Sequence, residues 1–434
     1  MRTTDLIHQK REGEELSAEE IVYMVDGYSR GEIPDFQMAA FLMAVYFSGM
    51  SEDEATAMTD YLVRSGEALD LSDIPGVKVE QSSTGGVGDK TTLIAASIAA
   101  AAGVVVPIIA SRTSGFMGNT LDKIASIPGF RTDISLDDFK MVLREHGLAF
   151  MQQNQDIAPA DERVYALRDL SSTVDSIPLM ASSIMSKKLA AGIDAAVFDV
   201  KVGAGAHMKK QIDARRLAQM MITIGRRADK RVQALVTDMN QPIGFAVGNA
   251  LEIMEVSQTL QNMGPSDLTR IALELAARMI HVGKITKSLD EAREIAQNKL
   301  IDLSGYRKFK EVITAQGGNP QVLDRFELLP NALGAREIFT PRGGFVSAIN
   351  AEDIGRAAAM IGGGREIFSD EVDPAVGVIL EVKVGARVEN GSVLARLYYT
   401  NEERVEEAAE MVEDAFRISN SEPESRELIL EVVG

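Results

Sequence analysis

Three polar segments carry residue types that could bind a small anionic or heterocyclic ligand, and the first is the glycine loop at residues 83–89. This loop, STGGVGD, follows a predicted strand and precedes a predicted helix. Backbone N–H groups in such a loop, with the helix N-terminus behind them, form an anion-binding site. Thr84, Thr91 and Thr92 add hydroxyl donors and Lys90 adds a positive charge. Because the spacing fits neither a Walker motif nor a dinucleotide fingerprint, a purely structural turn is the alternative.

The second segment is the polar connection that follows the predicted strand VVVPIIAS and leads into another helix. Ligands bind outside the carboxyl ends of parallel strands, so this connection and the glycine loop are expected to face one crevice. The side chains that could reach this crevice are Ser111, Arg112, Ser114 and Thr120. The alternative is an ordinary connection in which Asn119 or Thr120 caps the helix.

The third segment, residues 165–188, combines an arginine with a serine and a lysine at helical spacing. Ser183 and Lys187 lie four residues apart, so they share one face of a helix. The planar guanidinium of Arg168 could add two parallel donors. Three donors on one edge suit a small heterocycle with carbonyl groups. The alternative is that Lys187 and Lys188 lie on a solvated helix end.

The elements that would position these segments alternate between strand and helix over about 250 residues. Apolar strands are predicted at 77–83, 104–111, 195–202 and 231–239, each followed by a helical stretch. This alternation indicates an α/β domain with a mostly parallel sheet. Residues 93–110 carry no charge, but Gly103 and Pro107 divide them into an Ala-rich and a β-branched half. We therefore predict a buried helix followed by a buried strand rather than a membrane span.

Two flanking regions differ from this pattern. Residues 1–66 contain two capping boxes, Ser17 with Glu20 and Ser51 with Glu54, and are predicted to form three short helices. Residues after 331 alternate apolar and polar positions and predict a small β-rich module with a terminal helix at 402–418. The predicted organisation is a helical domain at 1–66 with 161–189 returning to it, an α/β domain at 67–160 and 190–330, and a C-terminal α+β module at 331–434.

The composition limits the classes of function that fit the chain. The chain has 434 residues and no cysteine, which excludes a disulfide scaffold, thiol catalysis and cysteine-bound metals. A formal net charge of −19 disfavours a large nucleic-acid footprint or an anionic membrane surface, although a local cationic pocket is compatible with it. The N-terminal segment is charged and has no apolar stretch, so we predict no secretory signal and a cytoplasmic location.

Several long segments follow one known family in order along the whole chain. They include GYSRGEIPDFQMAAFLMAVYFSGM, STGGVGDKTTL, YALRDLSSTVDSIPLMASSIMSKKLAAG, TDMNQPIGFAVGNALE and VDPAVGV. In these segments the sequence resembles the pyrimidine nucleoside phosphorylases, including thymidine phosphorylase. The resemblance implies a helical domain, an α/β domain, an α+β tail, a cleft that closes by domain rotation, and a homodimer formed through the helical domain. It also implies phosphorolysis of pyrimidine nucleosides to free base and (deoxy)ribose 1-phosphate.

The resemblance also implies roles for individual residues. Arg168, Ser183 and Lys187 would hold the base, with Arg168 and Lys187 stabilising the charge that the leaving base acquires. Phosphate would contact the side chains at Ser83, Thr84, Thr92 and Thr120. No organic cofactor is expected. A potassium ion would bind at Gly88, Ile243, Ala246 and Glu255, mostly through backbone carbonyls, although Lys90 could place an ammonium near that site instead.

The chain departs from the family pattern on the phosphate side. Gln81 and Ser82 replace a lysine and a histidine, Ala110 replaces a serine, and residues 116–119 read FMGN where the family has H-T-G-G. Losing one charge-assisted contact to an anion costs about 1.5–3 kcal/mol. Gln81, Ser82, Lys90 and Arg112 could supply compensating contacts. A diverged nucleoside hydrolase, an enzyme for a modified nucleoside and a catalytically silent pyrimidine-binding protein therefore stay open beside the phosphorylase.

Overall fold

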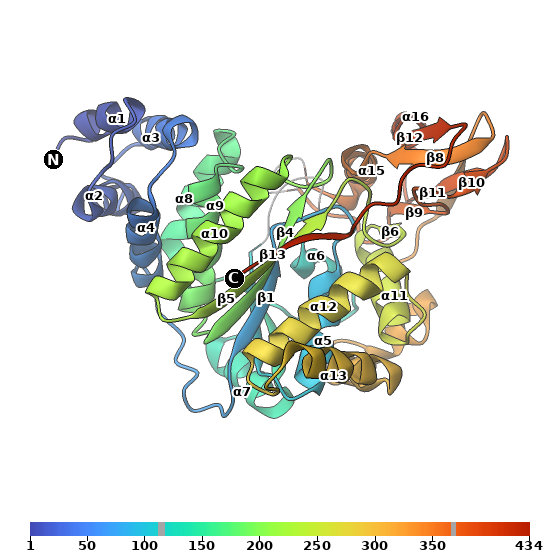
Figure 1. Ribbon diagram of the computed structural model, residues 1–434, viewed down its shortest axis with the longest axis horizontal. Helices are drawn as coiled ribbons and strands as arrows, with labels where there is room; N and C mark the ends of the chain where they lie inside the picture. The colour runs from blue at the N-terminus through green and yellow to red at the C-terminus, as the bar shows by residue number, and fades with distance from the viewer. Residues whose placement is uncertain (112–117, 366–369) are drawn as a thin grey trace.

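The computed structural model describes residues 1–111, 118–365 and 370–434. Three parts follow one another along the long axis: N-terminal helices, a central sheet covered by helices, and a smaller C-terminal part of strands and helices (Figure 1). This arrangement confirms the predicted fold class, a helical domain with a larger α/β domain and an α+β module.

The N-terminal part contains four helices, α1 (Thr3–Arg11), α2 (Ala18–Ser29), α3 (Asp35–Ser48) and α4 (Glu52–Arg64). Both predicted capping boxes are present at the starts of α2 and α4. The sequence predicts three helices here and does not predict α1, because its segment TTDLIHQKR has few apolar residues. This helix is held instead by Lys10, whose buried ammonium donates to both carboxylate oxygens of Glu54 at 2.7 and 2.9 Å.

The central sheet is mostly parallel, as predicted. Parallel pairing joins β1 (Val79–Ser83), β4 (Ala195–Val202) and β5 (Arg231–Asp238), and also β2 (Val106–Ala110) and β3 (Leu148–Gln152). A parallel bridge from Lys78 to Val105 connects the two groups, so the strands run in the order β3-β2-β1-β4-β5. Because the strands are parallel, their carboxyl ends and the loops that follow them lie along one edge.

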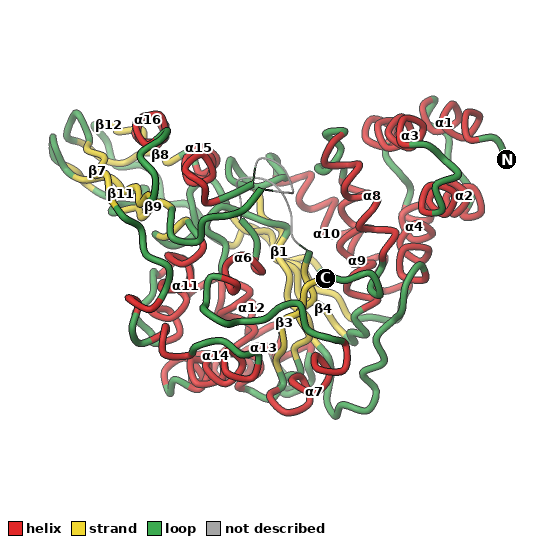
Figure 2. Tube along the Cα trace, turned by 180° about the vertical axis from the view of Figure 1, so that it is seen from behind, coloured by secondary structure: helices red, strands yellow, loops and turns green. Residues whose placement is uncertain are grey.

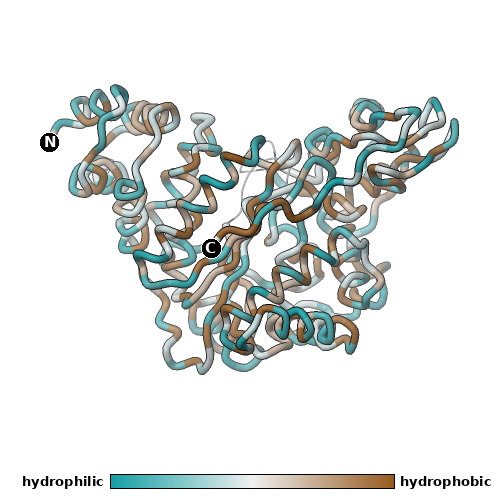
Figure 3. Tube along the Cα trace, in the orientation of Figure 1, coloured by the Kyte–Doolittle hydropathy of each residue, from teal (hydrophilic) through white to brown (hydrophobic). Residues whose placement is uncertain are grey.

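Helices cover both faces of this sheet. α9 (Ile177–Ala190) and α10 (Gln211–Arg227) lie on one face, and α5 (Thr91–Ala101) and α12 (Ser266–Val282) lie on the other (Figure 1, Figure 2). Hydrophobic residues are concentrated in the central strands (Figure 3), and every residue of β4 is buried. α5 is buried almost throughout and leads into the buried strand β2, which confirms the prediction for the uncharged stretch 93–110. Among the described residues, no helix is long and apolar enough to cross a membrane.

α8 (Pro159–Leu170) and α9 return to the N-terminal helices. Ala160 and Val164 of α8 and Leu179 of α9 share one apolar core with α2, α3 and α4. The remaining helices of the central part are α6 (Thr120–Ala125), α7 (Leu136–His146), α11 (Asn249–Leu260), α13 (Leu289–Ile301) and α14 (Ser304–Ala315). Short 3-10 turns at Pro320–Leu323 and Phe326–Leu328 lead into the C-terminal part.

The described residues of the C-terminal part form two small sheets and two helices. One sheet has the order β6-β9-β11-β7, and the other the order β10-β8-β12. The bounds are β6 (Ala246–Val247), β7 (Gly334–Phe339), β8 (Gly344–Ile349), α15 (Ala351–Ala358), β9 (Gly377–Leu380), β10 (Arg387–Val388), β11 (Val393–Tyr399), α16 (Val405–Asp414) and β12 (Phe416–Ser419). A short π-helical turn, Ala359–Gly363, extends α15. The predicted terminal helix is therefore shorter than 402–418, because its last residues pair with β8.

The last strand, β13 (Ile429–Val433), leaves the C-terminal part and pairs antiparallel with β5 at the edge of the central sheet (Figure 1). The sequence does not predict this return, because it depends on a partner strand that is distant in the chain. Apart from this strand, the domain boundaries given above stay predictions.

Candidate active site

A cavity of about 200 Å³ lies at the carboxyl ends of β1 and β2, next to α9. All three segments singled out from the sequence contribute to its lining, as expected for loops at one edge of a parallel sheet. The sequence-predicted residues that line it are Gln81, Ser82, Ser83, Thr84, Thr92, Ser111, Thr120, Arg168, Ser183 and Lys187. The fold thus brings together the residues expected to hold a base and most of those expected to hold a phosphate.

Arg168 lies near the end of α8 and is 1% exposed. Its Nη2 donates to the carbonyl of Val174 at 2.6 Å and its Nη1 to that of Leu179 at 3.1 Å. Its Nε donates to the carbonyl of Thr173 at 3.5 Å. Since a guanidinium has five N–H groups, each terminal nitrogen keeps one N–H that no described residue accepts. The backbone therefore fixes a planar donor group at the wall of the cavity.

Lys187 and Ser183 share one face of α9, as their spacing predicted. The Lys187 ammonium donates to Asp161 at 2.8 Å and to the Ser183 hydroxyl at 3.0 Å. Tyr165 lies beside both cationic groups, with its ring centroid 5.8 Å from Lys187 Nζ and 5.4 Å from the Arg168 guanidinium carbon. Burial raises the pKa of Tyr165 to about 12, so this ring is neutral at physiological pH. The donors are thereby oriented before any ligand arrives.

The glycine loop is fastened to the neighbouring strand β4. The Thr84 N–H donates to the Asp199 carbonyl at 3.0 Å, and the Lys201 N–H donates to the Thr84 hydroxyl at 3.0 Å. Gly85 and Gly88 have φ angles of 93° and 71°, which non-glycine residues rarely adopt. Burial would raise the pKa of Asp89 at the end of the loop, but the ammonium groups of Lys201 and Lys123 outweigh this and hold the pKa below its usual value.

Gln81 is the third of the five residues of β1, at the position where the sequence departs from the family lysine. It is 1% exposed, and neither its amide nitrogen nor its amide oxygen has a partner among the described residues. Leaving such a group buried without a hydrogen bond costs about 1–3 kcal/mol. Because Gln81 lines the cavity, a ligand bound there could satisfy it.

Lys188 and Glu80 form a buried ion pair at the cavity wall that the sequence analysis did not identify. The Lys188 ammonium donates to Glu80 and to the carbonyl of Ile109, and both side chains are almost fully buried. Burial raises the pKa of Glu80, although the Lys188 charge opposes this. The interpretation of Lys187 and Lys188 as a solvated helix end is therefore wrong. Two adjacent lysines in a sequence do not indicate a buried ion pair, because the partner Glu80 is 108 residues away.

Of the two places expected for Lys90 from the sequence, the structure shows the second, at the predicted potassium site. Lys90 does not line the cavity, because its ammonium is buried on the other side of the glycine loop, where three acceptors hold it. Lys123 of α6 lines the cavity instead, donating to the Asp89 carbonyl at 2.5 Å and pairing with Glu252 at 2.9 Å.

Four residues of the second polar segment lie outside the described residues: Arg112, Ser114, Phe116 and Met117. Asn119 caps α6.

His207 also lines the cavity, and the sequence analysis assigned it no role. It follows the carboxyl end of β4, so the rule that ligands bind at strand ends could have identified it. Burial lowers the pKa of His207 to about 4, and the nearby Arg168 charge acts in the same direction. At neutral pH the imidazole is therefore uncharged and can accept or donate a hydrogen bond at the cavity wall.

This shift predicts how stability depends on pH. Between about pH 6.5 and pH 4, the unfolded chain binds a proton at residue 207 and the folded chain does not, so stability falls as the pH falls. We expect His207→Gln to lose less stability than the wild type between pH 7 and pH 5, by roughly 1–2 kcal/mol. Urea unfolding at the two pH values measures this, with exposed His8→Gln as the matched control. Equal losses in all three proteins would contradict the prediction.

Comparisons with known proteins agree with this architecture. The chain matches the family models for the helical bundle domain of the glycosyl transferase family at residues 4–66 and for its a/b domain at residues 76–303. Residues 345–419 match the pyrimidine nucleoside phosphorylase C-terminal domain. Among solved structures, anthranilate phosphoribosyltransferase from Thermus thermophilus shares the fold, with a TM-score of 0.59, 17% identity, and coverage of 72% of this chain and 99% of that one.

Curated relatives are similar over the whole length. The pyrimidine-nucleoside phosphorylase of Geobacillus stearothermophilus is 42% identical over 433 residues, covering 100% of both chains. The enzymes of the same name from Bacillus subtilis and Staphylococcus haemolyticus are 44% and 43% identical, each covering 96% of both chains. The full-length similarity and the three matching domain models show that the chain belongs to the pyrimidine nucleoside phosphorylase family of glycosyl transferases.

Proposed function

We propose that the protein cleaves the N-glycosidic bond of pyrimidine nucleosides with phosphate and releases the free base and (deoxy)ribose 1-phosphate. The observation that carries this proposal is the single cavity in which Arg168, Ser183 and Lys187 face the glycine loop. A set of fixed donors for a heterocycle lies beside a set of backbone amides for an anion. The relatives named pyrimidine-nucleoside phosphorylase are 42–44% identical to the chain, which supports the same reaction.

On the base side, the chemistry requires stabilisation of a leaving group. When the bond between C1′ and the base nitrogen breaks, the electron pair stays on the base, whose carbonyl oxygens and ring nitrogen gain negative charge. The remaining N–H groups of Arg168, the third N–H of Lys187 and the Ser183 hydroxyl can donate to these atoms. Donors that are already oriented stabilise this charge more in the transition state than in the bound nucleoside.

On the phosphate side, the loop amides and the N-terminus of α5 supply most of the attraction. Phosphate would contact Ser83, Thr84, Thr92 and Thr120, and its oxygen would form the new bond to C1′ as the base departs. Ser82 and the unpartnered amide of Gln81 line the same region, and Lys123 adds a cation at the cavity wall. Because the family lysine is absent at position 81, we expect weak phosphate binding.

The proposal predicts that base release requires phosphate. Uridine, thymidine and deoxyuridine are each incubated with the protein, with and without millimolar phosphate, and free base and sugar 1-phosphate are quantified. We expect release of base only with phosphate, in a one-to-one ratio with sugar 1-phosphate. Release that is indifferent to phosphate would show a hydrolase. No release from any of the three, together with binding of uracil or thymine, would indicate a silent binding protein or an enzyme for a modified nucleoside.

A variant at the altered position sharpens this test. Gln81→Lys restores a positive charge where Gln81 lines the cavity, so we expect the KM for phosphate to fall about tenfold or more, as one charge-assisted contact implies. The KM for the nucleoside should stay near that of the wild type. An unchanged KM for phosphate in a folded Gln81→Lys protein would contradict the placement of the anion beside β1.

A second prediction concerns the base side. Lys187→Met removes an ammonium that donates to the leaving base and keeps the length of the side chain, so we expect kcat to fall about 10²–10³-fold. The KM for phosphate should change little, because Lys187 lies on α9 rather than on the glycine loop. Lys210→Met, at an exposed position, is the matched control. A loss confined to the KM for phosphate would contradict the assigned role.

We also propose that the protein is a homodimer formed through the helical domain. Three aromatic side chains on α3 support this, because Phe36 and Phe47 are 73% and 80% exposed and Tyr46 is 38% exposed. Exposed aromatic groups clustered on one helix are typical of an interface. We also propose a cytoplasmic location for the protein.

This interface predicts a mass of two chains by sedimentation equilibrium. Phe47→Glu should shift the protein to single chains at micromolar concentration, because it places a charge in an apolar contact. Leu333→Glu, at an equally exposed position outside the helical domain, should leave the mass unchanged. A wild-type mass of one chain would refute the dimer.

A further inference from the structure

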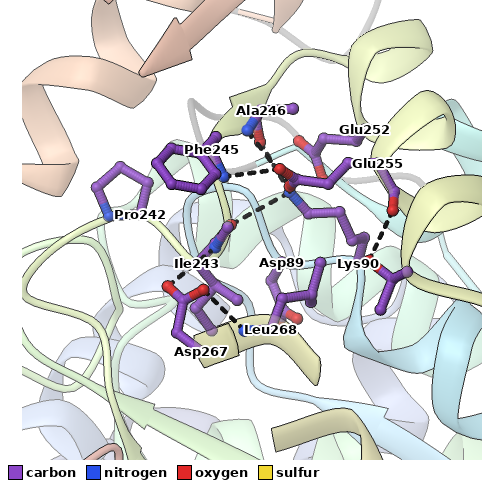
Figure 4. Close-up of polar contacts among 12 residues, drawn as sticks. Asp89, Lys90, Pro242, Ile243, Phe245, Ala246, Glu252, Glu255, Asp267 and Leu268 are labelled. Carbon is purple, nitrogen blue, oxygen red and sulfur yellow. Dashed lines mark hydrogen bonds and ion pairs between the residues drawn. The ribbon is translucent and has the colours of Figure 1, made fainter. Parts of the chain in front are cut away.

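Lys90 directly precedes α5, and its side chain is completely buried. Its ammonium donates to the carbonyls of Ile243 at 3.2 Å and Ala246 at 2.8 Å, and to the Glu255 carboxylate at 2.5 Å (Figure 4). A lysine ammonium has three N–H groups, so these three acceptors satisfy it completely. Lys90 is therefore a fixed cation in a cage of oxygen atoms.

The cage would otherwise suit a free metal cation. Two backbone carbonyls and a carboxylate are the oxygen ligands that hard cations prefer. The backbone of Gly88 closes another side, since a Cβ atom there would lie 2.9 Å from the Ile243 oxygen and 3.1 Å from the Ala246 oxygen. These are also the residues at which the sequence analysis predicted potassium. The Lys90 ammonium already makes the contacts that such an ion would make.

The charge balance around the cage also disfavours an additional cation. The Glu255 carboxylate pairs with Lys90 and accepts the N–H groups of Phe245 at 2.8 Å and Ala246 at 3.3 Å. Lys383, from the C-terminal part, pairs with Asp267 at 2.9 Å and donates to the carbonyls of Pro242 and Gly244. The loop between β5 and α11 thus holds two ammonium groups matched by two carboxylates. A potassium ion would add a third positive charge, so the residues present do not fit it.

We propose that Lys90 is a built-in cation that takes the place of a bound monovalent metal ion and makes the fold independent of potassium. The inference concerns the structure behind the cavity and does not rest on the proposed function. A tethered ammonium cannot dissociate, so the cage stays closed at any potassium concentration.

The position of the cage shows what this cation stabilises. The loop that supplies Ile243 and Ala246 includes β6, which pairs with β9 of the C-terminal part. Lys90 itself directly follows the glycine loop and directly precedes the first residue of α5. The ammonium therefore connects the segment that lines the cavity to the segment that carries the C-terminal part. Lys90 is a positioning residue, because it does not line the cavity.

The test compares thermal unfolding in potassium chloride and in choline chloride at equal ionic strength. We expect the wild-type melting temperature to be the same in both salts. Lys90→Ser opens the cage and leaves a hydroxyl oxygen, so its melting temperature should drop by several degrees in choline chloride. Potassium should restore at least half of this loss in a saturable way. Lys90→Met fills the space without charge or oxygen, so it should show a similar loss and no recovery.

Two results would overturn the proposal. One is a saturable, potassium-specific rise in the melting temperature of the wild type, which would show that the cage binds the ion beside Lys90. The other is a folded Lys90→Ser protein that responds to potassium no more than Lys90→Met does.

If Lys90→Ser is recovered in folded form only from potassium buffers, the proposal is supported. If it folds in no buffer, the wild-type comparison decides alone. Lys210→Met should respond to neither salt.

Discussion

The need to pair every buried ammonium group governs the structure around the cavity. Leaving one partner of a buried ion pair without the other costs about 3–5 kcal/mol, which is a large share of the stability of a domain. Four lysine side chains around the cavity are buried, and each is paired with a carboxylate. The pairs are Lys90 with Glu255, Lys123 with Glu252, Lys188 with Glu80, and Lys201 with Asp199. The pairs of Lys90, Lys123 and Lys188 join residues that are distant in the sequence, and Lys201 also lies 3.8 Å from Asp89 of the glycine loop, so moving a loop would separate charges.

The need to pair buried cations also explains why the hydrogen-bond donors of the cavity are oriented before a ligand binds. Arg168 is held by backbone carbonyls and Lys187 by Asp161, so neither side chain must be ordered when a ligand binds. Fixed donors lose little entropy on binding and need no reorganisation as charge develops on a leaving group. The N-terminal helices contribute to this arrangement, since α8 and α9 carry Arg168 and Lys187 and also pack into the helical core.

Periodicity and turn residues were sufficient to predict β1, β2, β4 and β5 of the central sheet and the meeting of the loops that follow them, but not the short strand β3. The capping boxes at Ser17 and Ser51 were likewise local signals. The missed features depend on partners that are distant in the sequence. Lys188 reaches Glu80 across 108 residues and β13 returns to β5, and neither contact has a local pattern. For Lys90 the sequence left two places open, beside an anion or beside the predicted potassium site, and only the fold decides for the second.

Gln81 and Lys90, which lie on either side of the glycine loop in the sequence, have opposite electrostatic effects on the cavity. The neutral amide of Gln81 removes a charge from the cavity wall, whereas Lys90 adds a charge behind the loop. The Glu255 carboxylate at 2.5 Å neutralises the Lys90 charge locally, so this lysine contributes little to the potential at the cavity. Anion binding there consequently depends on backbone amides, the N-terminus of α5 and Lys123, which is itself paired with Glu252. The backbone dipoles of a fixed loop can bind a phosphate, but they attract it less strongly than the same loop would with an unpaired ammonium beside it.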